Sequence, residues 1–313
     1  MTRKPRAPRN RTLDVSGPEE ARLRREIVYE FEVGDFAGIE NKVFCGDAFE
    51  LLPKLPGSRF DLLFADPPYN LTKAFGREKF RQKSDESYEL WLDSWLRLCV
   101  PLLKPTASIY ICGDWRSSSA IQRAGSKYLK LQNRITWERE KGRGAKRNWK
   151  NSTEDIWFFA VSDDYVFNLD AVKMKRKVLA PYTEDGKPKD WHQDPNGNFR
   201  LTHPSNIWTD ISVPFWSMPE NTDHPTQKPE KLLAKIILAS THTGDSILDP
   251  FAGSGTTAVA AKKLGRGFVA IESDERYCLI AQKRLAAAES DDSIQGYSDG
   301  VFWERNAGVK SRK

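Results

Sequence analysis

Residues 246–272 read SILDPFAGSGTTAVAAKKLGRGFVAIE: a short apolar run, a glycine-containing loop, a helical stretch and a second apolar run. This order predicts a strand–loop–helix–strand unit, the building block of a parallel sheet with helices on its faces. Gly253 and Gly255 let the backbone approach a ligand, and the helix start presents free N–H groups. The stretch therefore predicts an α/β fold with a nucleotide-like cofactor on the loop that begins at Asp249.

The same loop also matches the dinucleotide pattern G-x-G-x-x-A, and Glu272 at the end of the next strand is well placed to take ribose hydroxyls. An NAD-dependent oxidoreductase is therefore an alternative on this loop alone. The loop lacks the Gly-Lys-Ser/Thr ending of a P-loop, which disfavours ATP.

Outside this unit, strand-like runs and helical stretches alternate in two blocks that the sequence predicts to form one domain. Between them the periodicity fades into Pro, Gly, Asn, Asp and Lys, which predicts an inserted recognition region. The expected division is a flexible basic N-terminal arm at 1–35, a catalytic half at 36–161, a target-recognition region at 162–223, a cofactor half at 224–290 and a C-terminal tail at 291–313.

A second loop, Asp66-Pro67-Pro68-Tyr69, follows the apolar run 60–65. Adjacent prolines stiffen the backbone and cannot donate hydrogen bonds. Their carbonyls and the Asp66 carboxylate form a rigid surface of acceptors beside an aromatic ring, which suits an amine held in the plane of a π-system. Loops that leave the carboxyl ends of strands in an open α/β sheet converge on one crevice, so we expect this loop to meet the one at Asp249.

A third loop, HPTQKP at residues 224–229, precedes an amphipathic helical stretch. Pro229 suits the first helical turn. Thr226 and Lys228 near the helix start are candidates to hold a carboxylate, such as that of a methionine moiety. The alternative is a plain helix-capping loop, and His224 is predicted to be structural.

The chain carries a formal net charge of +6, which favours a polyanionic partner. Basic residues cluster in the N-terminal arm, at 139–150 and at 173–177. The middle cluster contains two glycines and a tryptophan, and it joins two predicted strands of a hairpin. We interpret it as a loop that contacts phosphates; the alternative is a solvated hairpin on which the indole folds back. The candidate binding residues of this loop are Arg143, Lys146, Arg147, Trp149 and Lys150.

The four cysteines form no CxxC pair and no zinc spacing, so we expect reduced core thiols and no metal site. The first residues lack an apolar signal core, and no stretch approaches the length of a membrane span. The sequence therefore predicts a cytoplasmic protein.

Taken together, DPPYN, HPTQKP and DPFAGSGTT, in that order, resemble the β-class DNA amino-methyltransferases. In this circularly permuted family the catalytic loop precedes the recognition region and the cofactor loop follows it. The similarity runs from about Lys42 to Ala288. It implies a seven-stranded, mostly parallel, doubly wound sheet, S-adenosylmethionine as the cofactor and double-stranded DNA as the substrate. A homodimer and a cognate restriction endonuclease are the further partners that the resemblance admits.

The resemblance also implies roles for individual residues. Asp66, Pro67, Pro68 and Tyr69 are the catalytic loop, and residues 72–86 are a mobile flap beside it. Glu272 is the ribose ligand, and Asp47, at the end of KVFCGD, meets the adenine of the cofactor. The implied cofactor loop comprises Asp249, Phe251, Gly253 and Gly255.

The aspartate that heads the catalytic loop favours the N6 amine of a flipped adenine as the methyl acceptor. A cytosine-N4 methyltransferase is the alternative: it would share nearly every other feature, but in that group the loop usually begins with serine instead of the aspartate found at Asp66. No cysteine lies in a Pro-Cys loop of the kind that cytosine-C5 enzymes use, so we expect direct transfer without a covalent enzyme intermediate. A non-catalytic DNA-binding protein would explain the charge but not the cofactor loop.

Overall fold

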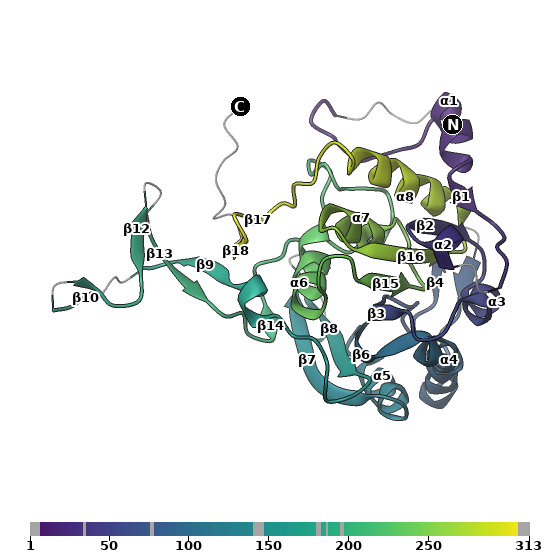
Figure 1. Cartoon of the computed structure of the whole chain (residues 1–313), viewed down its shortest axis with the longest axis horizontal. Helices are drawn as coiled ribbons and strands as arrows, with labels where there is room; N and C mark the ends of the chain where they lie inside the picture. The colour runs from purple at the N-terminus through teal and green to yellow at the C-terminus, as the bar shows by residue number, and fades with distance from the viewer. Residues whose placement is uncertain are drawn as a thin grey trace.

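A nine-stranded sheet runs through the centre of the computed structural model, in the order β1-β2-β16-β15-β3-β6-β8-β7-β14 (Figure 1). The structure describes residues 7–33, 36–75, 78–139, 147–179, 183–185, 187–194 and 197–305. The strands of this sheet are β1 (Ile27–Val28), β2 (Lys42–Cys45), β16 (Gly267–Glu272), β15 (Ser246–Asp249), β3 (Phe60–Ala65), β6 (Leu103–Gly113), β8 (Thr153–Ala160), β7 (Lys130–Glu138) and β14 (Ile207–Trp208).

Within the described part of this sheet, β8 alone runs antiparallel to its neighbours. The predicted α/β fold with a mostly parallel sheet is confirmed. A two-residue strand, β1 or β14, extends each edge beyond the seven longer strands.

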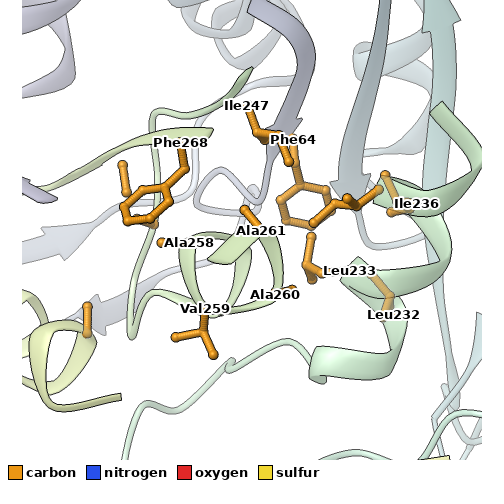
Figure 2. Packing of buried hydrophobic residues seen from close by; sticks show 14 of the residues in the cluster. Phe64, Leu232, Leu233, Ile236, Ile247, Ala258, Val259, Ala260, Ala261 and Phe268 are labelled. Atoms are coloured by element: carbon orange, nitrogen blue, oxygen red, sulfur yellow. The ribbon is translucent and has the colours of Figure 1, made fainter. Parts of the chain in front are cut away.

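Helices cover both faces of the sheet, and the strands alternate their side chains between the two faces. In β3, Leu62 and Phe64 enter one hydrophobic cluster, whereas Leu63 and Ala65 enter the other. One face is covered by α3 (Ala48–Leu51), α4 (Asp85–Cys99) and α5 (Ser118–Ser126), and the other by α6 (Glu230–Ser240), α7 (Thr256–Lys263) and α8 (Glu275–Ala287). Figure 2 shows the second face, where Phe64 and Phe268 from the strands pack against α6 and α7.

The N-terminal segment belongs in part to the folded body. The sequence predicts a flexible arm over 1–35, yet α1 (Gly17–Arg24) buries Leu23, and β1 pairs with β2 at the edge of the sheet. Leu13 N also donates to Asn221 O at 2.8 Å. The expectation of a loose arm is therefore wrong for residues 13–28, because the apolar Leu23 and Ile27 find a place in the core; residues 1–6 lie outside the described part.

A second sheet extends away from the body, in the order β12-β13-β9-β18-β17 (Figure 1). It combines strands of the expected recognition region with the two C-terminal strands. Residues 297–303 therefore belong to this second sheet, whereas the sequence predicts only a tail at 291–313. The strands are β9 (Met174–Lys177), β12 (His192–Asp194), β13 (Gly197–Thr202), β17 (Tyr297–Ser298) and β18 (Val301–Trp303).

Two hairpins and four short helical segments complete the part of the chain that the structure describes. The expected flap carries β4 (Lys73–Phe75) and β5 (Glu78–Phe80), which pair with each other. The other elements are β10 (Thr183–Glu184), β11 (Lys187–Pro188), α2 (Phe36–Ile39), η1 (Leu52–Lys54), η2 (Val100–Leu102) and η3 (Leu169–Val172). Among the described helices, none combines the length and the apolar character that a membrane crossing requires.

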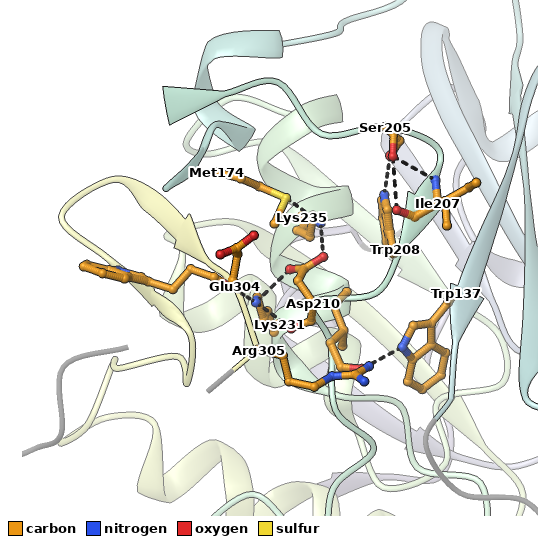
Figure 3. A network of polar contacts seen from close by, with 12 residues as sticks. Trp137, Met174, Ser205, Ile207, Trp208, Asp210, Lys231, Lys235, Glu304 and Arg305 are labelled. Carbon is orange, nitrogen blue, oxygen red and sulfur yellow. Dashed lines mark hydrogen bonds and ion pairs between the residues drawn. The ribbon is translucent and has the colours of Figure 1, made fainter. Parts of the chain in front are cut away.

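A buried ion cluster fastens the second sheet to the body (Figure 3). The Asp210 carboxylate lies 2.7 Å from Lys231 Nζ and 3.0 Å from Lys235 Nζ, and all three side chains are buried. Lys231 Nζ also donates to the carbonyl of Trp303 in β18. Since both lysines belong to α6, this helix joins the large sheet to the second sheet, and all of its residues are buried.

Candidate active site

The three predicted loops and the end of β2 meet around one cavity of about 340 Å³. The strands β2, β16, β15 and β3 are neighbours in the sheet, so the loops that follow them emerge side by side. All twelve residues predicted for catalysis or cofactor binding are described, and Gly255 alone does not line this cavity. The lining ones are Asp47, Asp66, Pro67, Pro68, Tyr69, Thr226, Lys228, Asp249, Phe251, Gly253 and Glu272.

Hydrogen bonds hold the catalytic loop in place. Tyr69 Oη donates to Asp66 Oδ1 at 2.9 Å, and Tyr88 Oη donates to the Pro68 carbonyl at 3.0 Å. The Asn70 side chain pairs with the backbone of Lys83, donating at 3.0 Å and accepting at 2.8 Å, so the far end of the expected flap is tied to the loop. Burial raises the pKa of Tyr69 well above its ordinary value, which keeps the ring a neutral phenol.

Lys228 lies against the catalytic loop. Its ammonium is 2.5 Å from Asp66 Oδ2 and 3.4 Å from Glu154 Oε2, and its side chain is 5% exposed. Burial opposes its charge, but the nearby carboxylates of Asp66 and Glu154 raise the pKa of Lys228 above its ordinary value. The sequence predicts Lys228 as a ligand of the cofactor's carboxylate; in the structure, two protein carboxylates already hold it.

Glu154, which the sequence does not predict for this site, pairs with Lys228, and Arg139, predicted only as part of the basic cluster, pairs with Glu154. Glu154 is 3% exposed in β8 and accepts a hydrogen bond from the Arg139 guanidinium. The sequence does contain one signal for Glu154, a charged residue at the start of an apolar strand. Buried glutamates are rare unless they are paired, so this position indicates that Glu154 has a charged partner. That signal does not identify the partners, which come from other segments.

The cofactor loop is closed by carboxylates that accept hydrogen bonds from its own backbone. Asp249 accepts from Phe251 N at 3.0 Å and from the Thr257 hydroxyl. Glu272 accepts from Gly253 N and Asp274 N, each at 2.8 Å. Burial raises the pKa of Asp249 to about 7. Asp249 therefore shapes the loop from within, as well as lining the cavity.

A side chain at Gly253 and a side chain at Gly255 would meet different parts of the protein. Both glycines have left-handed backbones, with φ of +53° at Gly253 and +78° at Gly255. A Cβ on Gly253 would lie 3.0 Å from His224 Nε2, at the cavity wall. A Cβ on Gly255 would lie 2.5 Å from the Cβ of Ala281 in α8. Gly255 does not line the cavity, and its lack of a Cβ allows α7 to pack closely on α8, so its contact with a ligand stays a prediction.

Aromatic side chains form another wall of the cavity. Phe80 in the flap hairpin and Trp91 in α4 have ring centroids 5.2 Å apart, and Trp91 lies 6.2 Å from Phe251 of the cofactor loop. All three line the cavity. Flap, helix and cofactor loop thus share one apolar surface. Within the described residues, no group of three or more His, Cys, Asp or Glu side chains is arranged to hold a metal ion.

The loop between β7 and β8 leaves Trp149 in solvent. Its indole is 93% exposed, and Arg147 and Lys150 beside it are exposed. The alternative in which the indole folds back onto the hairpin is therefore wrong for this structure. Arg143 and Lys146 lie outside the described residues. The DNA-binding role of the loop stays a prediction.

The basic cluster at 173–177 is partly engaged within the protein. Lys175 Nζ lies 4.6 Å from the ring centroid of Phe199 and 4.5 Å from that of Trp303. Lys173 pairs with Asp170 at 2.8 Å. These contacts show that at least part of this charge stabilises the second sheet.

A second cavity, of about 250 Å³, lies on the other side of Lys228. It shares His224, Thr226, Gln227 and Lys228 with the first cavity. Its further lining residues are Trp137, Arg139, Glu154, Val213, Pro214, Asn221 and Pro225. Lys228 thus stands in the wall between the two cavities.

Comparison with known proteins places this geometry among DNA methylases. The model of the N6/N4 methyltransferase family, described as DNA methylase, matches residues 60–283. The chain is 35% identical over 261 residues to the DNA adenine methyltransferase YhdJ of Escherichia coli strain K12, covering 81% of this chain and 85% of YhdJ.

Two solved structures share the fold. The PvuII DNA methyltransferase (cytosine-N4-specific) aligns with a TM-score of 0.60 at 16% identity, covering 85% of this chain and 94% of that chain. The M1.HpyAVI–SAM complex aligns with a TM-score of 0.50 at 24% identity, covering 78% of this chain and 98% of that chain. At these identities the likeness shows the fold alone.

Proposed function

Because the chain belongs to the N6/N4 DNA methylase family, we propose that it transfers the methyl group of S-adenosylmethionine to the N6 amine of adenine within a specific DNA sequence. The observation that carries this proposal is the single cavity in which the Asp66 loop and the Asp249 loop meet. The choice of adenine is supported by the name of the relative from E. coli and by the aspartate that heads the catalytic loop.

The residues around the cavity fit S-adenosylmethionine. Gly253 brings the loop backbone to the cavity wall, and a Cβ there would crowd His224, which lines the same cavity. Asp47 and Glu272 bring carboxylates that can accept from an amine or from hydroxyls, while Phe251 adds an aromatic surface. We assign the adenine of the cofactor to Asp47, its ribose to Glu272 and its carboxylate to the region of Thr226. When bound, S-adenosylmethionine supplies a methyl group on a sulfonium, which is already an activated leaving group.

The protein's own residues prepare the acceptor. A base amine is a weak nucleophile because its lone pair is delocalised, and the base must leave the duplex at a cost of a few kcal/mol. Asp66 accepts hydrogen bonds from the amine, the rigid Pro67–Pro68 backbone holds the loop, and the Tyr69 ring stacks on the base. Positioning and electrostatics therefore supply most of the acceleration.

We assign the contact with DNA to the loop between β7 and β8. Arg147 and Lys150 are exposed cations suited to phosphates, as Arg143 and Lys146 are by residue type. Trp149 presents a bare indole that can stack on an unpaired base or fill the place that the base leaves. DNA as the substrate also favours the cytoplasm as the compartment in which the protein works. A homodimer and a cognate restriction endonuclease stay predictions from the sequence.

The direct test is to incubate the protein with duplex DNA and methyl-labelled S-adenosylmethionine, and then to identify the product by nucleoside mass spectrometry. We expect N6-methyladenine, and methylation-sensitive sequencing of the same DNA gives the recognition sequence. N4-methylcytosine without N6-methyladenine would select the alternative, a cytosine-N4 methyltransferase. No labelled DNA at all would overturn the proposal.

A further inference from the structure

Four side chains of alternating charge connect the catalytic loop to the base of the basic hairpin. Asp66 pairs with Lys228, Lys228 with Glu154, and Glu154 with Arg139. The four come from four segments: the catalytic loop, the loop before α6, β8 and the residue just after β7. The side chains of Asp66, Lys228, Glu154 and Arg139 are 13%, 5%, 3% and 30% exposed, so solvent screens the inner pairs little.

In this arrangement both oxygens of the Asp66 carboxylate are already in use. Oδ1 accepts from Tyr69 Oη at 2.9 Å, and Oδ2 accepts from Lys228 Nζ at 2.5 Å. A base amine that is to be methylated needs an acceptor on the same carboxylate. Each carboxylate oxygen can accept a second hydrogen bond, but the Lys228 ammonium takes one of these sites and attracts the negative charge of Asp66, so Lys228 competes with the substrate that the proposed function assigns to this site.

Glu154 is a second carboxylate with which the Lys228 ammonium can pair. Its Oε2 atom is 3.4 Å from the same ammonium, on the side of the second cavity. Lys228 and Glu154 line that cavity, whereas Asp66 is not among its described lining residues. A short movement of Lys228 Nζ away from Asp66 thus brings it closer to the Glu154 carboxylate and into the second cavity.

Resting on the proposed function, we propose that Glu154 is a positioning residue for methyl transfer. It draws Lys228 away from Asp66 when the target amine arrives, and so leaves an Asp66 oxygen to that amine. Arg139 holds the other oxygen of Glu154 and directly follows β7, where the basic loop begins. Binding of DNA to that loop is therefore transmitted to Glu154 through Arg139.

The first test compares Glu154→Gln with Asp155→Asn. Asp155 is the next residue of β8 and points to the opposite face, where it accepts from Ser118 Oγ at 2.9 Å and from Thr136 Oγ1 at 3.0 Å. Both changes remove one negative charge from one strand. We expect Glu154→Gln to lower kcat for labelled-methyl transfer roughly 100-fold, the loss typical of a misplaced reacting group. KM for DNA and the Kd of S-adenosylmethionine stay unchanged, and Asp155→Asn keeps the kcat of the unmodified protein.

The pH profile separates positioning from a structural role. The groups facing Lys228 are Asp66 and Tyr69 of the catalytic loop, Glu154 of β8 and Cys112 of β6, with Arg139 behind Glu154. Since Glu154 helps to raise the pKa of Lys228, its removal lowers that pKa. Asp66 still raises this pKa in Glu154→Gln, so we expect only that any gain in kcat from neutralising Lys228 begins at lower pH in the variant than in the unmodified protein. A pH profile of kcat with unchanged shape would indicate a structural role.

The second test places Glu154→Gln in a Lys228→Met background. If Glu154 acts through Lys228, the added change alters kcat by less than about twofold, because a residue without its partner has nothing left to position. Because the double variant leaves Asp66 and Arg139 without these partners, thermal unfolding of each variant checks that it is folded before kcat is compared.

The outcomes separate the two proposals. An unmodified protein that does not methylate DNA overturns the proposed function. An active protein whose Glu154→Gln variant keeps a normal kcat, or loses as much kcat in the Lys228→Met background as alone, overturns the role of Glu154 only.

Discussion

The loop after β15 and the loop between β7 and β8 leave the same sheet, but they differ in what holds them. In the first, Asp249 and Glu272 accept hydrogen bonds from the loop backbone, and the φ angles of Gly253 and Gly255 are left-handed. In the second, Trp149 is 93% exposed and its backbone N–H donates to the adjacent Asn148 side chain at 2.7 Å. The loop after β15 is thus pre-organised by hydrogen bonds within the protein, which lowers the entropy cost of binding a ligand, whereas the loop between β7 and β8 leaves Trp149 in solvent, where we propose that it meets DNA.

The catalytic loop lies between these two regions and is expected to show the largest effect. Asp66→Ala removes the acceptor for the base amine, so we expect methyl transfer to fall by at least about 100-fold to 1,000-fold. Labelled-methyl incorporation into duplex DNA measures this loss. Asp163→Ala, a change at an exposed carboxylate whose side chain is 83% accessible, is the control that should keep full activity. Incorporation near the normal rate in Asp66→Ala would remove Asp66 from the chemistry.

On the cofactor side, Gly255→Val tests internal packing. The first added carbon would already lie 2.5 Å from Ala281 Cβ, and the φ of +78° disfavours any side chain. We expect a loss of about 3 kcal/mol or more in the free energy of unfolding, measured by urea denaturation. Gly244→Val is the matched control, since Gly244 has a similar φ of +87° but a Cβ there would meet no atom within 4 Å. Equal losses in both variants would mean that the contact with α8 contributes nothing.

In the loop between β7 and β8, Trp149→Ala tests whether methyl transfer depends on the proposed contact of Trp149 with DNA. A stacking contact is worth about 1–3 kcal/mol, so we expect methylation of duplex DNA to weaken while S-adenosylmethionine affinity and Tm stay unchanged. The double variant Arg147→Ala, Lys150→Ala should reduce the slope of log affinity against log salt by about one unit for each phosphate that the protein no longer binds. Normal methylation by Trp149→Ala together with an unchanged salt slope would identify the loop as a solvated hairpin.

A pH dependence of stability is also expected at the cofactor loop. Burial raises the pKa of Asp249 from 3.8 to about 7, so the folded state retains a proton that the unfolded state loses. The stability that this carboxyl contributes is therefore present at pH values below 3.8 and declines as pH rises toward 7. Asp249→Asn cannot titrate, and its unfolding free energy should lack this decline. Parallel pH profiles of stability in the two proteins would contradict the assignment.

Much of the fold follows from local pattern. The strands 42–45, 60–65, 246–249 and 267–272 were predictable because a strand buried on both faces is a continuous apolar run. The convergence of the Asp66 and Asp249 loops was predictable because both follow strands of one parallel sheet. The position of the C-terminal strand β18 was not predictable, because this strand pairs with β9 and places Phe302 beside Met174, which lies far away in the chain.

The sequence by itself determined which chemistry is available and where each loop begins, because apolar periodicity, proline and glycine act over a few neighbouring residues. Only the tertiary structure decided which charges meet. Lys228 follows a loop motif that predicts a cofactor ligand, but it lies on Asp66, 162 residues earlier in the chain, and beside Glu154. Gly255 likewise looks like a ligand-binding glycine until α8 packs against it. Such contacts depend on how segments that are distant in the chain pack together, and a local sequence pattern does not encode this packing.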